Sequence, residues 1–326
     1  MAMLSLRKDA AFDLLRLALN KPRFDQKPTD RIRAQILSGI IANEREPSAI
    51  AERAWLSALY GTHPYSRPNE GTKAGLASIS PADLSVFHRA AFARDGLHIA
   101  VVGDIDANAL GEKLDQLFGE LPQMQALAPV TDVVPKLGQQ VEVNYDLPQT
   151  SLQLAYPGVT RDAPDFYAVV LMNDILGGSA FTSRLWDQVR EKRGLAYGVG
   201  SALEDKEHSQ ALLVTTATRS DRAPETLSVI RDVVKQMAEH GPTATELAAA
   251  KRYLIGAFAI NELNSSASIA ATLVGLQSSN LGIDYIQRRA GLIDQVTLDQ
   301  VKAAAKKLLS SEPAIMVVGP PLGAKG

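Results

Sequence analysis

The pattern of apolar and polar positions predicts helices and strands that come in groups rather than in strict alternation. Residues 223–241 have the apolar spacing of an amphipathic helix that ends at Gly241. Residues 139–159 alternate like a pair of strands, and residues 211–220 read as one further strand. Between them, residues 162–194 have a helical period. This grouping predicts an α+β fold with a mostly antiparallel sheet.

Two stretches of the chain resemble each other. Ser78–Ile105 and Gln295–Pro321 each read as a capped helix, a short loop and a buried strand that ends in Val-Val-Gly. Ser80 and Thr297 are the expected N-caps of the two helices. The second copy therefore predicts the same sequence of elements as the first.

The resemblance extends upstream with a nearly constant offset. Thr29 and Thr243 each follow a proline at the start of a long helix. The separation between these two threonines is almost the same as the separation between Val102 and Val318. Two such similar offsets indicate that the chain contains an internal repeat of two homologous halves.

Residues 126–142 are rich in proline, glutamine and small side chains, which is typical of a linker. They divide the chain into residues 1–125 and residues 143–326. Thr29 lies close to the start of the first half, whereas a much longer segment, residues 143–242, precedes Thr243 in the second. The comparison predicts that the first half lacks its front portion, while the second half is complete.

Composition narrows the classes of function. The chain is 46% hydrophobic and 21% charged, which is ordinary for a globular protein. A net charge of −2 gives no indication of a nucleic-acid partner, and no apolar run is long enough to predict a membrane span. The absence of cysteine excludes thiol catalysis, disulfides and cysteine-ligated zinc.

Several motifs together resemble one family. YGTHPYSRPNEGT (residues 60–72), FHRAAFARDGLHIAVVGDI (residues 87–105) and above all GGSAFTSRLWDQVREKRGLAY (residues 177–197) are similar to the pitrilysin/insulinase family of zinc peptidases, which includes the mitochondrial processing peptidases. The resemblance implies paired, homologous α+β domains, each with a sheet of about six strands covered by helices. It also implies a clamshell that closes around an unfolded peptide.

The family's zinc chemistry depends on an H-x-x-E-H motif, which would fall in the front portion that the first half lacks, and on a more distant glutamate. No two histidines of this chain are four positions apart; they are His63, His88, His98, His208 and His240. Where active members have the third ligand, this chain has Gly39 after Ser38, and Glu44 and Glu46 are the nearby alternatives. The resemblance therefore predicts a subunit without a metal site of its own, so that zinc is expected in a partner subunit.

The resemblance also implies that the second half sends an arginine, and a tyrosine seven positions later, into the active site of the opposing zinc domain. Arg190 and Tyr197 match this pair, and Arg193 is the second candidate for the arginine. A tyrosine hydroxyl can stabilise the oxyanion of peptide hydrolysis. The alternative interpretation is structural, because cations favour a helix C-terminus and tyrosine is common in strands.

Further residues are candidates for substrate contacts or for structural roles. Gln149 could bind peptide backbone, and Gly177-Gly178 is interpreted as a helix break beside the cleft. Arg193 joins these as a substrate-binding candidate. His63 is interpreted as part of a turn whose neighbouring tyrosines pack inward, and Asp106 as a helix N-cap.

The sequence thus predicts a non-metal-binding subunit of a heteromeric zinc metalloprotease, with a homologous zinc-bearing subunit as partner and unfolded peptides as substrates. A purely structural or peptide-binding scaffold is the alternative, and a homodimer stays open. A self-sufficient protease is disfavoured by the histidine spacing. The residues around REKRGLAY (residues 190–197) resemble those of the bacterial members, which favours a bacterial source. The periplasm is slightly favoured over the cytoplasm as the location.

Overall fold

The structure is a computed structural model that describes residues 5–179 and 181–322. Its contacts divide the chain into two compact units. The first comprises Met1–Ile40, Glu70–Pro129 and Ala257–Tyr285; the second comprises Ile41–Asn69, Val130–Gly256 and Ile286–Gly326. Each unit combines segments from both of the halves expected from the repeat, and the boundary at residues 126–142 stays a prediction.

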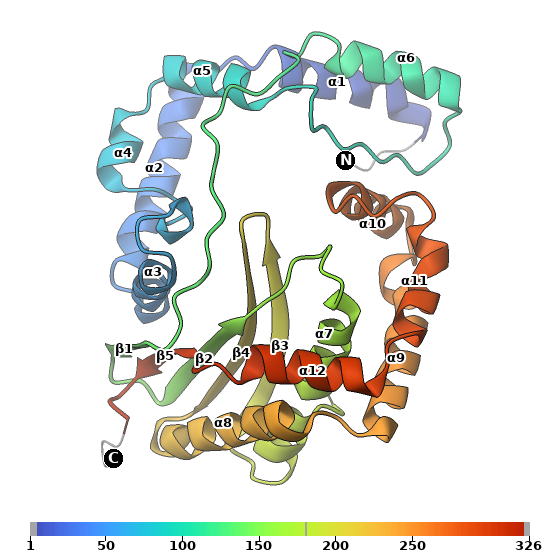
Figure 1. Cartoon of the computed structure of the whole chain (residues 1–326). Helices are drawn as coiled ribbons and strands as arrows, with labels where there is room; N and C mark the ends of the chain where they lie inside the picture. Colours follow the sequence, from blue (N-terminus) through green and yellow to red (C-terminus); the bar gives the residue numbers. More distant parts are fainter. Residues whose placement is uncertain (1–4, 180, 323–326) are drawn as a thin grey trace. The chain divides into compact units, whose positions relative to one another are not determined.

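The second unit is built on a five-stranded sheet (Figure 1). Its order is β1-β5-β2-β4-β3, and only β1 and β5 run parallel among these strands. The strands are β1 (Gln140–Asn144), β2 (Gln149–Pro157), β3 (Ala196–Lys206), β4 (Ser209–Arg219) and β5 (Ala314–Gly319). The predicted α+β class with a mostly antiparallel sheet is confirmed. The expectation that residues 139–159 form a strand pair is wrong in one respect, because β5 lies between β1 and β2.

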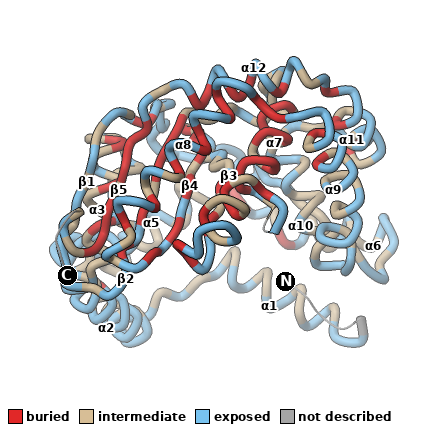
Figure 2. The backbone as a smooth tube through the Cα atoms, turned by 90° about the horizontal axis from the view of Figure 1, so that it is seen from below, coloured by how far each residue is buried: buried red, intermediate tan, exposed pale blue. Residues whose placement is uncertain are grey.

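One face of the sheet is covered by α7 (Phe166–Asn173), α8 (Ala223–His240) and α12 (Leu298–Leu309). Alternate strand residues such as Leu152, Leu154 and Val214 face these helices and are fully buried. Burying each such side chain stabilises the fold by about 1.5–3 kcal/mol. Figure 2 shows that buried residues concentrate in the sheet and these helices.

The opposite face of the sheet is covered only in part. The helix α3 (Pro47–Tyr60) packs Trp55, Leu59 and Tyr60 against Ala155 and Ala314. The remainder of this face carries exposed or half-exposed residues of β2 and β4. The uncovered part is where the candidate site lies.

The turn after α3 has the packing that the sequence predicts. Tyr60 is buried and meets the ring of Tyr65 edge-on, at 5.8 Å between ring centroids. His63 caps the short turn, because its Nδ1 accepts from the amide of Tyr65 at 3.2 Å, and its Nε2 lies 2.8 Å from the carbonyl of Thr131. His63 is therefore a structural residue of this turn.

The first unit is mostly helical: α1 (Lys8–Asn20), α2 (Gln26–Asn43), α4 (Lys73–Ser78), α5 (Pro81–Ala91), α6 (Ala107–Phe118) and α10 (Ser266–Ser278). Two further helices are α9 (Ala244–Glu262) and α11 (Tyr285–Asp294).

The predicted N-caps are confirmed: Ser80 and Thr297 each form a reciprocal capping box, and Asp106 accepts from the amide of Ala109. None of the described helices is both long and apolar enough to cross a membrane.

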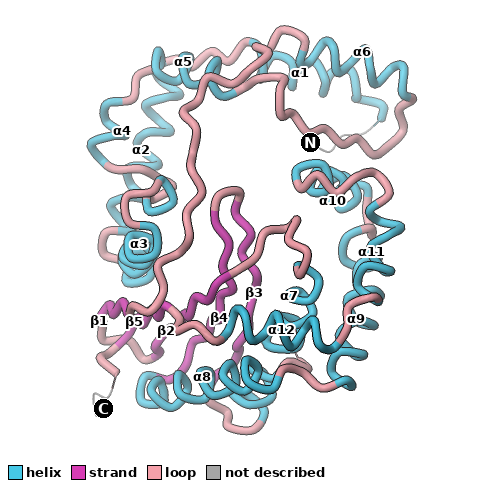
Figure 3. Tube along the Cα trace, in the orientation of Figure 1, coloured by secondary structure: helices cyan, strands magenta, loops and turns pink. Residues whose placement is uncertain are grey.

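The strand expected in the first half, ending at Gly103, does not form. Figure 3 shows loop throughout the connection between α5 and α6. Val101 is 39% exposed, whereas its counterpart Val317 in β5 is 3% exposed. The two segments differ because a strand needs neighbouring strands to pair with. β5 lies between β1 and β2, whereas within the described residues no strand lies beside residues 98–103. Phe87 is likewise 61% exposed, although its counterpart Ala304 is 2% exposed.

Candidate functional site

The segment that leads into β3 contains two helical turns that are wider than those of an α-helix. They are Asp174–Gly178 and Trp186–Glu191, and each closes with a π-type hydrogen bond. The amide of Ser179 donates to the carbonyl of Asp174 at 3.1 Å, and that of Lys192 to Asp187 at 2.9 Å. π-Turns are rare in proteins, and those that occur are frequently found at functional sites.

Gly194 lies shortly after the second π-turn. This glycine has φ +58°, a left-handed conformation that favours residues without a Cβ. Its amide donates to the carbonyl of Arg190, and the next amide, of Leu195, donates to Val189, both at 2.9 Å. The chain thereby passes from helix into strand within a few residues, so that the start of β3 lies next to Arg190.

A β-bulge then turns Tyr197 outward. Ala196 pairs with Thr218, but the next paired residue of β3 is Val199, opposite Thr216. Tyr197 and the glycine after it therefore share one position of the opposing strand. As a result, the side chain of Tyr197 is 87% exposed although it belongs to the sheet.

Arg190 and Tyr197 are in contact. The guanidinium carbon of Arg190 lies 4.9 Å from the centre of the Tyr197 ring and 4.2 Å from that of Trp186. Both distances are within the range of a cation–π interaction. Glu191 lies 4.0 Å from the Arg190 Nε, beyond hydrogen-bond distance. The two predicted catalytic residues therefore form one cluster at the surface.

The cluster adjoins a hollow of about 380 Å³ on the uncovered sheet face. Small and polar residues line it, among them Ser151, Gln153, Thr215, Gly198 and Gly200. A Cβ on Gly198 would meet nothing within 4 Å, so the backbone of β3 is open at this residue, whereas a Cβ on Gly200 would lie 3.3 Å from the carbonyl of Gly177. The hollow is thus suited to an extended chain that presents its own backbone amides and carbonyls.

The other predicted residues lie in different places. Gln149 is exposed at the start of β2, opposite Arg219, at the sheet end where β3 begins. Arg193 donates to the carbonyl and to the side-chain oxygen of Gln188, at 2.8 and 2.7 Å, and borders a separate groove beside α8. The structure brings Gln149 to the same end of the sheet as Tyr197, and Arg193 to a different surface.

Gly177 is a packing residue. It is buried, and a Cβ at this position would lie 2.6 Å from the backbone nitrogen of Ser201 and 2.8 Å from Leu185. A Cβ on Gly178 would lie 2.9 Å from the side-chain nitrogen of Asn173. Gly177 thus lets the first π-turn pack directly against β3, whereas Gly178 lies close to Asn173 at the end of α7. A substrate contact by these glycines stays a prediction.

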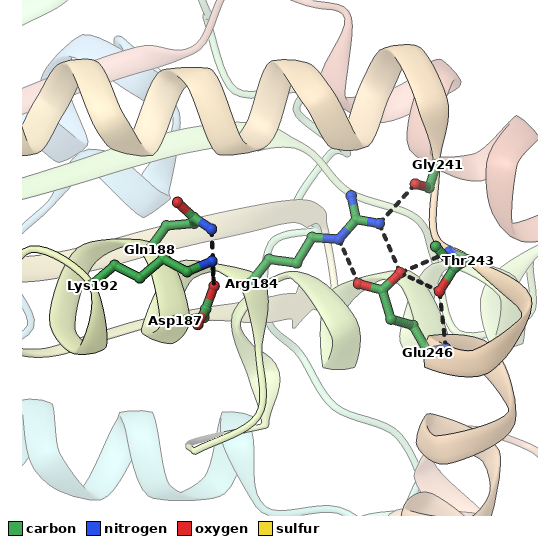
Figure 4. A network of polar contacts seen from close by, with 7 residues as sticks. All are labelled: Arg184, Asp187, Gln188, Lys192, Gly241, Thr243 and Glu246. Atoms are coloured by element: carbon green, nitrogen blue, oxygen red, sulfur yellow. Dashed lines mark hydrogen bonds and ion pairs between the residues drawn. The ribbon is translucent and has the colours of Figure 1, made fainter.

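An ion pair that sequence reasoning missed anchors the segment before Trp186 (Figure 4). Arg184 donates to both carboxylate oxygens of Glu246, at 2.7 and 2.8 Å, and to the carbonyl of Gly241 at 3.0 Å. Glu246 also accepts from the amide of Thr243 at 2.7 Å, which caps α9. The Thr-x-x-Glu spacing of Thr243 and Glu246 is a sequence signal for the capping of α9, but not for the ion pair with Arg184.

Two carboxyl groups near the site have shifted pKa values. The hydrogen bonds from Arg184 lower the pKa of Glu246 to about 2. Burial raises the pKa of Asp174, in the first π-turn, to about 6. No sequence signal singled out Asp174, because its burial depends on how the π-turn packs.

The part of the chain that the structure describes does not offer a set of residues that fits zinc. Gly39 lies on α2 with open space around its Cα and has no side chain to bind a metal. Across residues 5–179 and 181–322, no group of three or more His, Cys, Asp or Glu residues is placed to hold a metal ion.

Residues 78–254, more than half of the chain, match the family model of the peptidase M16 inactive domain. The chain belongs to the M16 peptidase family. The predicted resemblance to the insulinase and pitrilysin peptidases is therefore confirmed. The matched model is that of the family's inactive domain.

Relatives of this M16 chain support the assignment. An uncharacterized zinc protease of Mycobacterium tuberculosis is 29% identical over 297 residues, covering 87% of this chain and 66% of the relative. A peptidase M16 inactive domain structure from Pseudomonas fluorescens is 33% identical with a TM-score of 0.88, covering 98% of this chain and 77% of that one. The non-peptidase homologue YmxG of Helicobacter pylori is 25% identical over 251 residues, covering 76% of this chain and 58% of the homologue. The chain spans just under two thirds of the mycobacterial relative's length.

The close packing at Gly177 predicts a stability difference between two glycines. Gly177→Ala forces a methyl group against the backbone of β3, and we expect it to destabilise the fold by about 1–3 kcal/mol. Gly198→Ala is the matched control, because a Cβ there meets nothing within 4 Å. Thermal unfolding followed by circular dichroism should show a lower Tm for the first variant only. Equal Tm values for both would contradict the packing argument.

The Arg184–Glu246 pair predicts a pH-dependent contribution to stability. The pKa of Glu246 is about 2 in the folded chain against an ordinary 4.5, so the contribution is complete above pH 4.5 and is lost as the pH falls toward 2. Glu246→Gln should lower the free energy of unfolding at pH 7 by about 1–2 kcal/mol, since water screens part of the attraction.

Urea denaturation at pH 7 and pH 3 measures this difference. Glu225→Gln is the control, because Glu225 pairs with Arg222 on an exposed part of α8. A loss at pH 7 no larger than that of the control, or an undiminished loss at pH 3, would argue against the role of Glu246.

Proposed function

We propose that this chain is the non-catalytic subunit of a heteromeric M16 peptidase and that it supplies Arg190 and Tyr197 to the zinc site of a homologous partner subunit. The observation that carries the proposal is the contact between these two side chains at an exposed bulge beside the hollow on the sheet. A surface tyrosine held in this way has no evident role in the stability of its own subunit.

Tyr197 would act as a hydrogen-bond donor in the transition state. In a zinc peptidase the metal activates water and polarises the scissile carbonyl. Negative charge then develops on the former carbonyl oxygen, and a phenolic hydroxyl aimed at it lowers the barrier. The exposure of Tyr197 leaves its hydroxyl accessible to a substrate held by another subunit.

Arg190 would orient the substrate and the tyrosine. Its planar guanidinium lies between two aromatic rings, which fixes the plane without occupying its N–H donors. Those donors can bind a substrate carbonyl close to Tyr197. Both residues would therefore contact the same peptide group.

The hollow beside the pair supports an unfolded peptide as the substrate class. Its lining offers hydroxyl and amide groups from Ser151, Gln153 and Thr215 and lacks a charged side chain. Such a surface binds peptide backbone without selecting charged residues. Gln149 lies at the sheet end where Tyr197 is exposed and would extend this binding surface.

A scaffold without a proteolytic role is the alternative. The relationship to the Helicobacter pylori non-peptidase homologue favours it. Against it stands the exposed Arg190–Tyr197 contact, since a scaffold does not require an arginine and a tyrosine presented together.

Tyr197→Phe separates the two functions. In the complex with the zinc-bearing partner, we expect the variant to lower kcat for an unfolded, fluorogenic peptide by about 100-fold, with little change in KM, because only the transition-state hydrogen bond is lost. Tyr253→Phe is the control, since Tyr253 is an exposed tyrosine on α9 outside the hollow. A Tyr197→Phe complex as active as the control complex would favour the scaffold.

A further inference from the structure

We propose that Trp186, Thr216 and Thr218 are positioning residues that hold Arg190 and Tyr197 in their active arrangement before any partner or substrate binds. This inference rests on the proposed function for its consequence in catalysis. Its structural content concerns this chain alone.

Trp186 is the platform for Arg190. Its side chain is buried, and the Arg190 guanidinium lies over its ring at 4.2 Å. The indole Nε1 donates to Glu191 Oε1 at 3.0 Å, and the ring of Phe181 meets the indole edge-on at 5.0 Å. The indole is therefore held by several neighbours and offers the guanidinium a fixed ring to lie over.

Two threonines of β4 hold the bulge of β3. The hydroxyl of Thr218 donates to the carbonyl of Leu195 at 2.6 Å, and that of Thr216 donates to the carbonyl of Gly198 at 2.7 Å. Both threonines are on the helix-facing side of the sheet and are buried. An extra residue in one strand disrupts the regular ladder, and the two hydroxyls bond carbonyls on either side of it.

The bulge is also connected to α8. The Thr218 hydroxyl lies 3.0 Å from that of Thr226, which in turn lies 2.9 Å from the carbonyl of Arg222. A hydroxyl has one hydrogen, so while Thr218 donates to Leu195, the Thr226 hydroxyl can donate either to Thr218 or to the Arg222 carbonyl. The position of Tyr197 thus depends on buried groups of two elements that lie beneath it.

The two supports converge on one contact. Trp186 fixes Arg190 from the π-turn, the threonines fix Tyr197 from β4, and the two supported side chains touch at 4.9 Å. A pair fixed in this way loses little conformational entropy when a substrate binds. The partner subunit would therefore meet a preformed pair.

Fluorescence of Trp186 tests the arrangement in the isolated chain. The sequence has two tryptophans, and Trp55→Phe leaves Trp186 as the only one. In this background we expect Thr216→Val with Thr218→Val to increase iodide quenching of Trp186 at least twofold. The reason is that a displaced bulge removes Tyr197 from Arg190, and the Arg190 guanidinium that lies over the indole is then free to move away. Thr215→Val is the matched control, since Thr215 is next to Thr216 but is exposed, whereas Thr216 is buried.

Activity with the partner tests the consequence. The double threonine variant should lower kcat at least tenfold with KM unchanged, and Thr218→Ser, which keeps a hydroxyl, should retain most of the activity. Unaltered quenching and unaltered kcat in a folded double variant would overturn the inference. Increased quenching with an unaltered kcat would support the positioning and overturn the proposed role of the pair in catalysis.

Discussion

The one-residue irregularity at the start of β3 determines where the candidate functional side chains lie. A regular antiparallel ladder would pair every residue of β3 with one of β4, but Tyr197 and Gly198 together oppose a single position. Gly194, in a left-handed conformation, brings the chain to this point directly from the helix that carries Arg190. With both features in place, the guanidinium and the phenol ring are in contact and the tyrosine is exposed.

Local signals in the sequence were sufficient for much of this arrangement. The N-caps at Ser80, Thr297 and Asp106 were predictable because a cap bonds its own helix. The helix end at Gly241 follows from the same kind of local rule, and the structure gives it φ +66°. The spacing and the family resemblance also singled out Arg190 and Tyr197, whose side chains are in contact; their role in catalysis stays a prediction.

Features that depend on distant segments could not be predicted in this way. Nothing near residues 139–159 indicates that β5, close to the other end of the chain, separates β1 from β2. The Val-Val-Gly segments at residues 101–103 and 317–319 have the same local sequence, yet only the second has neighbouring strands to pair with among the described residues. Arg184 and Glu246 are far apart in the sequence, so their ion pair required the fold itself.

The site is consistent with catalysis divided between two chains. Within the described residues no metal-binding cluster is present, and the position expected for a zinc ligand is a glycine. Beside the uncovered sheet face, the chain presents an arginine and a tyrosine held by buried neighbours. In the proposed function, a partner subunit supplies the metal and the attacking water, and this pair contributes to the hydrolysis.

Elemental analysis of the purified chain and of the partner that co-purifies with it tests this division most directly. The account predicts no bound zinc in this chain and one zinc per partner subunit. Stoichiometric zinc in this chain would contradict it, because residues other than Gly39 would then have to bind the metal.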